Sequence, residues 1–190
     1  MEKAAHSEKT IPIPEGVQIQ IEGRRVTVTG SRGSLTRDFS HSPIHIEKVD
    51  ETVKTYVHSP RKKVAAMVNT IAAHIENMIL GVTQGFTYIM KIVFAHFPIT
   101  VRVDQDKKQI RIENFIGERA PRYVGIYGDV NVSVEGDDVV IRGNNIEEVA
   151  QTAANIQART KIKDKDPRVF MDGIFIYRKL VGDDVIWKIL

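Results

Sequence analysis

The sequence contains one long internal repeat, and this repeat constrains the fold more than any other feature. In each half, two alternating strand patterns meet at a polar turn, a glycine follows, and a helical stripe leads to a further strand. The matching positions are Val26 with Ile110 and Gly33 with Gly117, both 84 residues apart, Val64 with Val149, 85 apart, and Gly85 with Gly173, 88 apart. A unit of this length present twice indicates a duplicated domain rather than an array of short repeats.

The hydrophobic period predicts the elements within each copy. Residues 17–29 and 99–112 alternate apolar and polar side chains around a turn, which predicts β-hairpins. Residues 64–79 and 146–156 place their apolar side chains on one stripe of a 3.6-residue helix. The predicted fold class is therefore α+β, with two tandem duplicated domains, each a small, mostly antiparallel β-sheet structure packed on one helix.

The ends of both helices carry recognisable signals. For the first helix, Ser59 is a candidate N-cap, Pro60 suits the first helical position, and Gly81 suits the C-terminal stop. For the second helix, Asn145 followed three residues later by Glu148 is an Asn form of the capping box.

Domain boundaries follow from the repeat and from Pro98, which interrupts the strand pattern between the copies. The expected segments are an N-terminal arm at 1–10, a first repeat at 11–96, a second repeat at 97–180, and a C-terminal strand or tail at 181–190.

Composition excludes several classes of protein. Of the 190 residues none is Cys, so disulfides, Cys-type zinc sites and thiol catalysis are excluded. No apolar run approaches the roughly 18 residues that span a bilayer, so we expect no membrane partner. The motifs of phosphate loops, metalloproteases and nucleophile elbows are missing. We therefore predict a protein that is not an enzyme and has no catalytic residue, metal site, cofactor or small-molecule substrate.

The charges are balanced overall, with 27 Lys plus Arg against 24 Asp plus Glu, so any anion-binding surface must be local. One local excess is Arg61, Lys62 and Lys63, which lie in the first turn of the predicted helix, where the helix dipole favours anions. Both a solvated turn and a phosphate contact fit this placement.

A second local excess lies between the second helix and the following strand. Its members are Arg159, Lys161, Lys163, Lys165 and Arg168. The spacing of two residues places the first four on one side of an extended segment. A charged surface loop with local ion pairs is the alternative, but we favour contact with a nucleic-acid backbone, because cations on extended segments follow phosphates well.

Four strings in this chain resemble one known family, the universal sixth protein of the large ribosomal subunit, which is called the ninth in eukaryotic naming. They are IPIPEGVQIQIEGRRVTVTGSRGSLTRDF (11–39), GVTQGFTYIMKIVFAHFPIT (81–100), IENFIGERA (112–120) and KDKDPRVFMDGIF (163–175). The last resembles the C-terminal signature of the archaeal and eukaryotic members. The resemblance covers nearly the whole chain, from about residue 11 to residue 177.

The resemblance implies a structural protein of the large ribosomal subunit in the cytoplasm. It implies binding to large-subunit ribosomal RNA near the sarcin–ricin region and the stalk base, with neighbouring ribosomal proteins as further partners. It also makes the second domain the main RNA-binding part and maps the signature segment onto residues 160–174, the stretch selected by charge. Arg178 and Lys179, which replace the usual continuation after this segment, are included among the candidate RNA contacts. Residues 122–128 are less basic than is usual in the family, which argues against RNA contact there.

A different class of function is an alternative. The aromatic residues Tyr123, Tyr127, Tyr177 and Trp187 would suit a protein-interaction module in a non-ribosomal complex.

Overall fold

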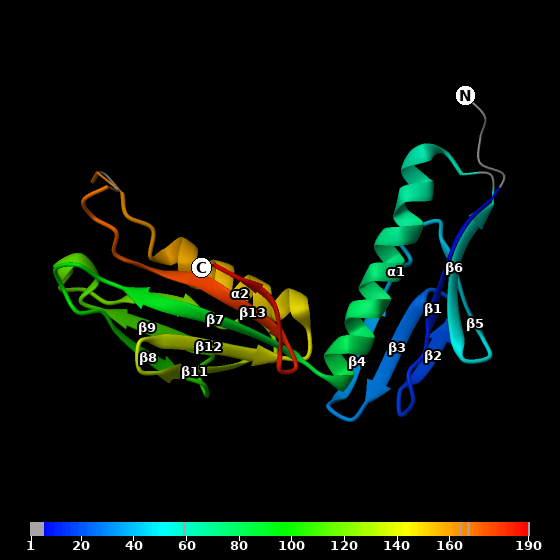
Figure 1. The fold of residues 1–190 in the computed structure, drawn as a ribbon, viewed down its shortest axis with the longest axis horizontal. Coiled ribbons are helices and arrows are strands. Elements are labelled where there is room, and N and C mark those ends of the chain that lie inside the picture. Colours follow the sequence, from blue (N-terminus) through cyan, green and yellow to red (C-terminus); the bar gives the residue numbers. More distant parts are fainter. Residues whose placement is uncertain (1–5, 59, 164, 167, 190) are drawn as a thin grey trace. The chain divides into compact units, whose positions relative to one another are not determined.

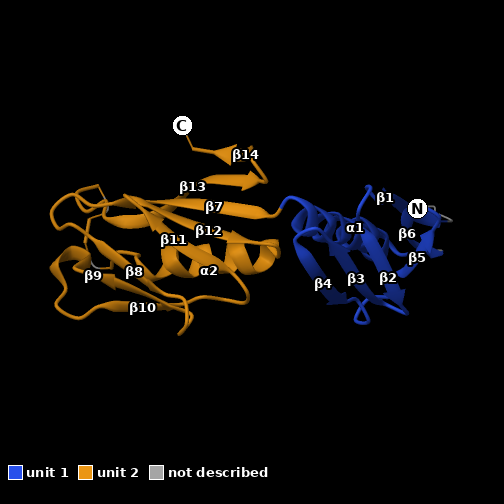
Figure 2. Cartoon of the chain, turned by 90° about the horizontal axis from the view of Figure 1, so that it is seen from below, with its two compact units in different colours: residues 1–84 blue, residues 85–190 orange. Residues whose placement is uncertain are grey.

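The computed structural model describes residues 6–58, 60–163, 165–166 and 168–189. Ser59, the candidate N-cap of the first helix, lies outside these residues. The chain divides into two compact units, which we call unit 1 (residues 1–84) and unit 2 (residues 85–190) and describe separately (Figure 2).

Unit 1 contains six strands followed by a long helix in its described part (Figure 1). The elements are β1 His6–Pro12, β2 Gln18–Glu22, β3 Arg25–Gly30, β4 Gly33–Asp38, β5 His45–Val49, β6 Thr52–His58 and α1 Lys62–Thr83. The strands form two antiparallel sheets with the orders β1-β6-β5 and β2-β3-β4. Helix α1 packs against strands of both sheets.

The core of unit 1 follows the predicted period. Val26 and Val28 of β3 are fully buried, whereas Thr27 between them is half-buried. On α1 the buried side chains recur three and four residues apart, at Val68, Ile71 and Ile75. The hydrophobic effect therefore holds the sheets and the helix together, because the apolar faces of all three meet in one cluster.

Both predicted ends of α1 are wrong. The helix begins at Lys62, with Arg61 as an N-cap whose backbone is extended, so Pro60 precedes the helix. It continues past Gly81 to Thr83 because Val82 is fully buried in the core and its carbonyl accepts a hydrogen bond from the Arg32 N–H at 2.9 Å.

Among the described helices, α1 is long and apolar enough to cross a membrane by length and composition. In unit 1 its apolar stripe packs into the core between the sheets.

Unit 2 repeats the order of strands and helix. Its elements are β7 Phe86–Val93, β8 Thr100–Asp104, β9 Gln109–Glu113, a 3-10 turn Phe115–Gly117, β10 Arg122–Gly125, β11 Asn131–Glu135, β12 Asp138–Gly143, α2 Ile146–Arg159, β13 Gly173–Val181 and β14 Asp184–Lys188. The strands form a sheet of order β10-β9-β8 and a sheet of order β11-β12-β7-β13-β14. The α+β class with tandem duplicated domains is confirmed.

Strand β7 differs from the sequence-based boundary, which placed residues 86–96 in the first repeat. It pairs with β12 on one side and β13 on the other, at the centre of the five-stranded sheet of unit 2. In unit 1 the place beside β6 is taken by β1, so residues 6–10 of the expected N-terminal arm belong to a strand. The alternating pattern of a strand does not specify which sheet buries its apolar face. For this reason the predicted boundary between the two domains lies after β7, whereas the structure divides the chain before it.

Candidate nucleic-acid interface

The cationic segment of unit 2 is a loop, residues 160–172, that connects α2 to β13. The Thr160 hydroxyl ties its two ends together: it lies 3.1 Å from the Ile156 carbonyl, to which it donates, and accepts from the Ile174 N–H at 3.2 Å. Gln157 adds a second tie, because its side-chain oxygen accepts from the Ile176 N–H at 3.3 Å. The loop is therefore anchored at its base to both the helix and the sheet.

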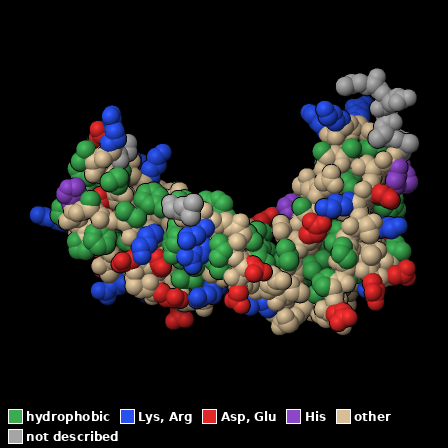
Figure 3. All heavy atoms as spheres, viewed as in Figure 1, with side chains coloured by type: hydrophobic (Ala, Val, Ile, Leu, Met, Phe, Trp, Pro, Cys, Tyr) green, Lys and Arg blue, Asp and Glu red, His purple; other side chains and the backbone are tan. Residues whose placement is uncertain are grey.

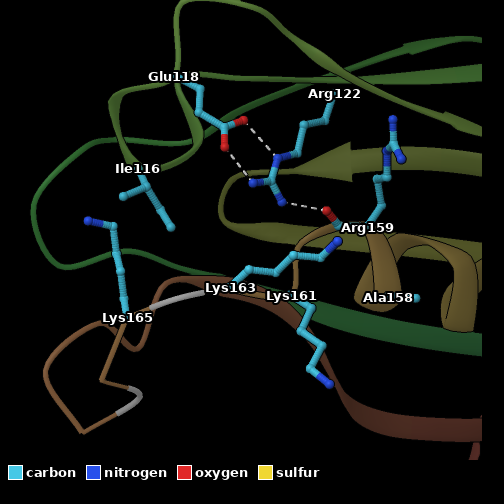
Figure 4. A pocket seen from close by; sticks show the side chains of 8 residues that line it. All are labelled: Ile116, Glu118, Arg122, Ala158, Arg159, Lys161, Lys163 and Lys165. Atoms are coloured by element: carbon cyan, nitrogen blue, oxygen red, sulfur yellow. Dashed lines mark hydrogen bonds and ion pairs between the residues drawn. The ribbon is translucent and has the colours of Figure 1, made fainter.

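A cleft of about 510 Å³ opens beside this loop (Figure 4). Its lining residues are Ile116, Glu118, Arg122, Ala158, Arg159, Lys161, Lys163 and Lys165. They come from the 3-10 turn and the residue that follows it, the start of β10, the end of α2 and the loop. Four of the predicted cations therefore lie around one cleft.

Arg122 forms one wall of the cleft and is fully engaged by the protein. Its Nε and Nη2 donate to the two carboxylate oxygens of Glu118 at 2.8 and 2.5 Å, and its Nη1 donates to the Arg159 carbonyl at 2.7 Å. Its guanidinium carbon lies 4.1 Å from the centre of the Phe115 ring. Hydrogen bonding from Arg122 holds the pKa of the Glu118 carboxyl below its usual value of 4.5. Among the described residues that line the cleft, the only acid is thus neutralised by a cation that also fastens the end of α2.

The other four cations of the cleft, Arg159, Lys161, Lys163 and Lys165, have no carboxylate partner within ion-pair distance in the part of the chain that the structure describes. All four residues are exposed. In Figure 4 Lys163 extends toward Arg159, and Lys161 points away from Arg122. The Lys165 ammonium lies 4.6 Å from the centre of the Phe170 ring. Because the Glu118 charge is already matched by Arg122, the described residues that line the cleft carry an excess of four positive charges, which favours a polyanion.

The structure does not bring the remaining predicted cations to this cleft. Arg168 belongs to the same loop, but its side chain is 90% exposed and lies 3.4 Å from Asp166. Arg178 and Lys179 belong to β13, where the Lys179 ammonium lies 5.2 Å from the Tyr88 ring centre and 4.9 Å from that of Trp187.

The cations Arg61, Lys62 and Lys63 are in unit 1, at the start of α1, and all three are exposed. Among the described residues, no side chain caps the N-terminus of this helix, and its first turn contains no acid. The positive end of the helix dipole is therefore not offset by an acid of the first turn.

Sequence reasoning missed Arg122, Glu118 and Ile116 as parts of the site. The spacing of Glu118 and Arg122 could have indicated an ion pair, but the contact of Arg122 with the end of α2 is a tertiary feature without a local signal. Arg122 lies within the stretch 122–128 that was expected to avoid RNA. Its engagement with Glu118 and Phe115 makes it a support for the cleft.

Outside the cleft, charges of both signs are mixed over the visible face of each unit (Figure 3). Among the described residues, no three His, Asp or Glu side chains gather as ligands for a metal ion.

Comparison with known proteins gives a consistent result over nearly the whole chain. The family model described as ribosomal protein L6 matches residues 13–85 and again residues 97–173. A protein of Desulfurococcus amylolyticus named large ribosomal subunit protein uL6 is 50% identical over 94% of this chain and 98% of its own length. Proteins of the same name from Methanosphaera stadtmanae and Methanobrevibacter smithii are 53% and 49% identical, over 94% and 93% of this chain and 97% and 98% of their own lengths.

Proposed function

We propose, from the premise that this chain belongs to the ribosomal protein L6 family, that unit 2 binds large-subunit ribosomal RNA near the sarcin–ricin region and the stalk base. The family consists of structural, non-enzymatic proteins of the large ribosomal subunit. The proposed role is therefore to hold RNA in its folded arrangement and so to support translation in the cytoplasm.

The observation that carries this proposal is the cleft with four cations that have no acidic partner among the described residues. Bringing phosphates to Arg159, Lys161, Lys163 and Lys165 releases counterions from the RNA, which is the main source of sequence-independent affinity. The cleft is preorganised, because Arg122 fixes the end of α2 and Thr160 closes the base of the loop. Preorganised cations lose less side-chain and loop entropy on binding.

The start of α1 is a second proposed phosphate contact. Arg61, Lys62 and Lys63 are exposed at a helix end that lacks both a cap and an acid. A phosphate there would offset the repulsion between the cations and the positive end of the helix dipole. Arg168, Arg178 and Lys179 are proposed as peripheral contacts, since the two β13 cations already lie near aromatic rings.

Protein neighbours are proposed for the edge of the five-stranded sheet. Strand β14 is the outermost strand, and its apolar side chains Val185, Ile186 and Trp187 are 51%, 55% and 41% exposed. An apolar edge strand of this kind is suited to contact with another protein chain. Family membership favours a neighbouring ribosomal protein as this partner over a complex outside the ribosome.

The test is the salt dependence of binding to a transcript that spans the sarcin–ricin and stalk-base regions. Replacing Lys161, Lys163, Lys165 and Arg168 by Ala should flatten the slope of log K against log salt by up to about 0.7–0.9 for each phosphate that is no longer neutralised. Filter binding at several salt concentrations measures the slope.

The matched control removes four exposed cations of unit 2 that lie outside the lining of the cleft. These are Arg102, Lys107, Arg142 and Lys188. The control variant should retain the slope of the wild-type protein. The comparison is between this control and the variant in which Lys161, Lys163, Lys165 and Arg168 are replaced by Ala. If both variants change the slope equally, the cleft is not the phosphate-binding site.

A further inference from the structure

The turn that follows β9 contributes to the wall of the cationic cleft and has an unusual backbone. Three of its four residues, 114–117, have positive φ angles: 58° at Asn114, 51° at Ile116 and 73° at Gly117. Asn and Gly adopt this left-handed conformation at little cost, whereas a β-branched side chain is strained in it. The strain in the turn is therefore concentrated at Ile116.

Contacts of the preceding residues hold the turn in this form. The Asn114 side-chain amide donates to the Pro98 carbonyl at 3.0 Å. Phe115 is 1% exposed, so its ring fixes the turn to the core of unit 2. A strained residue persists where the surrounding structure determines its conformation in this way.

The fold that the two units share does not require this conformation. In unit 1 the equivalent connection, residues 30–33 between β3 and β4, has a positive φ only at Gly33. The 84-residue repeat aligns Arg32 of that connection with Ile116. Strain that is present in one copy of a duplicated fold and not in the other indicates a function of the residue that bears it.

The side chain of Ile116 brings apolar surface into a cleft that is otherwise mainly cationic. Among the described residues that line the cleft, it is the only large apolar side chain (Figure 4). It is half-buried, so part of it can contact a ligand. A nucleic-acid strand presents both kinds of partner to such a cleft, because its charged phosphates alternate with sugars that have an apolar C–H face.

We propose that Ile116 packs on the C–H face of a ribose of the bound RNA, next to phosphates that the loop cations neutralise. The inference rests on the proposed function, because the same cleft takes the phosphates. It adds a contact that does not depend on salt, since burial of apolar surface releases no counterions.

The test is Ile116→Asn, measured on the transcript that spans the sarcin–ricin and stalk-base regions. Asparagine suits the backbone at this position, as Asn114 shows in the same turn, but lacks the apolar side chain. The variant should bind about fivefold more weakly at every salt concentration, the scale expected for loss of one apolar contact. The slope of log K against log salt should equal that of the wild-type protein, because no phosphate contact is lost. Filter binding measures both quantities.

Two further variants serve as controls for the binding measurement. Ile116→Leu keeps an apolar side chain of the same size and should stay within about twofold of the wild-type affinity. Ile186→Asn makes the same substitution at an exposed isoleucine of β14, outside the lining of the cleft, and should not change the affinity.

Stability distinguishes an RNA contact from a packing role of Ile116. Ile116→Asn should unfold at a urea concentration no lower than that of the wild-type protein, because the strain of a β-branched residue at positive φ is relieved. Weaker RNA binding together with a lower urea midpoint would show that Ile116 is kept for packing, and would overturn the inference. A changed salt slope in this variant would overturn it as well.

Lys163→Ala separates this inference from the proposed function. Unchanged affinity of Ile116→Asn, together with weaker binding by Lys163→Ala, would overturn the ribose contact and leave phosphate binding in place. If Lys163→Ala left the affinity and the slope unchanged, the proposed function of the cleft would fail.

Discussion

Arg122 and Lys163 line the same cleft, but their surroundings give them different roles. Arg122 donates to Glu118 and to the end of α2, and its side chain is only 22% exposed. Lys163 is exposed and has no acidic partner among the described residues. We therefore expect Arg122 to stabilise unit 2, and we propose Lys163 as a phosphate contact.

This assignment predicts different results for the two residues in unfolding experiments. Arg122→Ala should lower the free energy of unfolding of unit 2 by about 2 kcal/mol, because it removes three charge-assisted hydrogen bonds and the packing of the guanidinium on Phe115. Lys163→Ala should change it by less than about 0.5 kcal/mol. Urea titration followed by circular dichroism measures both. Equal losses of stability would show that Arg122 has no special structural role.

The Glu118 carboxyl gives a pH signature for the same contact. Its pKa is lower in the folded protein than its usual 4.5, so the unfolded chain binds more protons and the contact stabilises the fold above this pH. Glu118→Gln should therefore be less stable than wild type at pH 7. The difference should vanish as the pH falls below 4.5 through the depressed pKa. A difference between the two proteins that does not change with pH would contradict the ion pair. Urea titration at a series of pH values measures it.

At the scale of elements, the two helices show what local sequence can predict. Asn145 is confirmed as the N-cap of α2, but the predicted capping box takes a different form: the Asn145 side chain accepts from the Glu147 N–H at 3.0 Å. Its amide donates to Glu148 at 3.1 Å, while Glu148 also accepts from the Asp129 N–H at 2.8 Å. The link to Asp129 is a contact between elements, and the sequence carried no signal for it.

Asn145→Ala tests this cap. The expected loss of stability is about 1 kcal/mol, the usual cost of removing an N-cap side chain. Gln151→Ala, on the exposed middle of α2, is the matched control and should stay within about 0.5 kcal/mol of wild type. Equal effects of the two substitutions in urea titrations would argue against the cap.

The ends of α1 were predicted less well because tertiary packing overrides local signals there. Gly81 suits a helix stop, yet the helix continues because Val82 fills the core of unit 1. The cations of the loop after α2 were predicted as one group from their spacing alone. Their partners in the cleft, Glu118 and Arg122, come from a different part of unit 2 and required the structure.

At the scale of the whole molecule, β7 shows the limit of the repeat as a guide to domains. The repeat matched the strand after α1 with the strand after α2, which assigned residues 86–96 to the first copy. In the structure these two strands, β7 and β13, are neighbours in the sheet of unit 2. The order of the elements was therefore predictable from the sequence. Which sheet contains β7 was not, because it depends on pairing with strands that are distant in the sequence.

Fragments of the chain test this boundary. Residues 85–190 should fold, because β7 supplies the central strand of the sheet. Residues 97–190 lack that strand and should remain unfolded, since β12 and β13 lose their shared partner and the core loses Phe86 and Met90. Amide dispersion in proton NMR spectra distinguishes the two outcomes. A well-dispersed spectrum from the shorter fragment would contradict the assignment of β7.

The central claim is that the cleft of unit 2 binds the RNA of the large subunit. A cryo-electron microscopy map of the large ribosomal subunit that contains this chain tests it most directly. We expect RNA phosphates within contact distance of Arg159, Lys161, Lys163 and Lys165. A map in which this cleft faces solvent or another protein would contradict the claim.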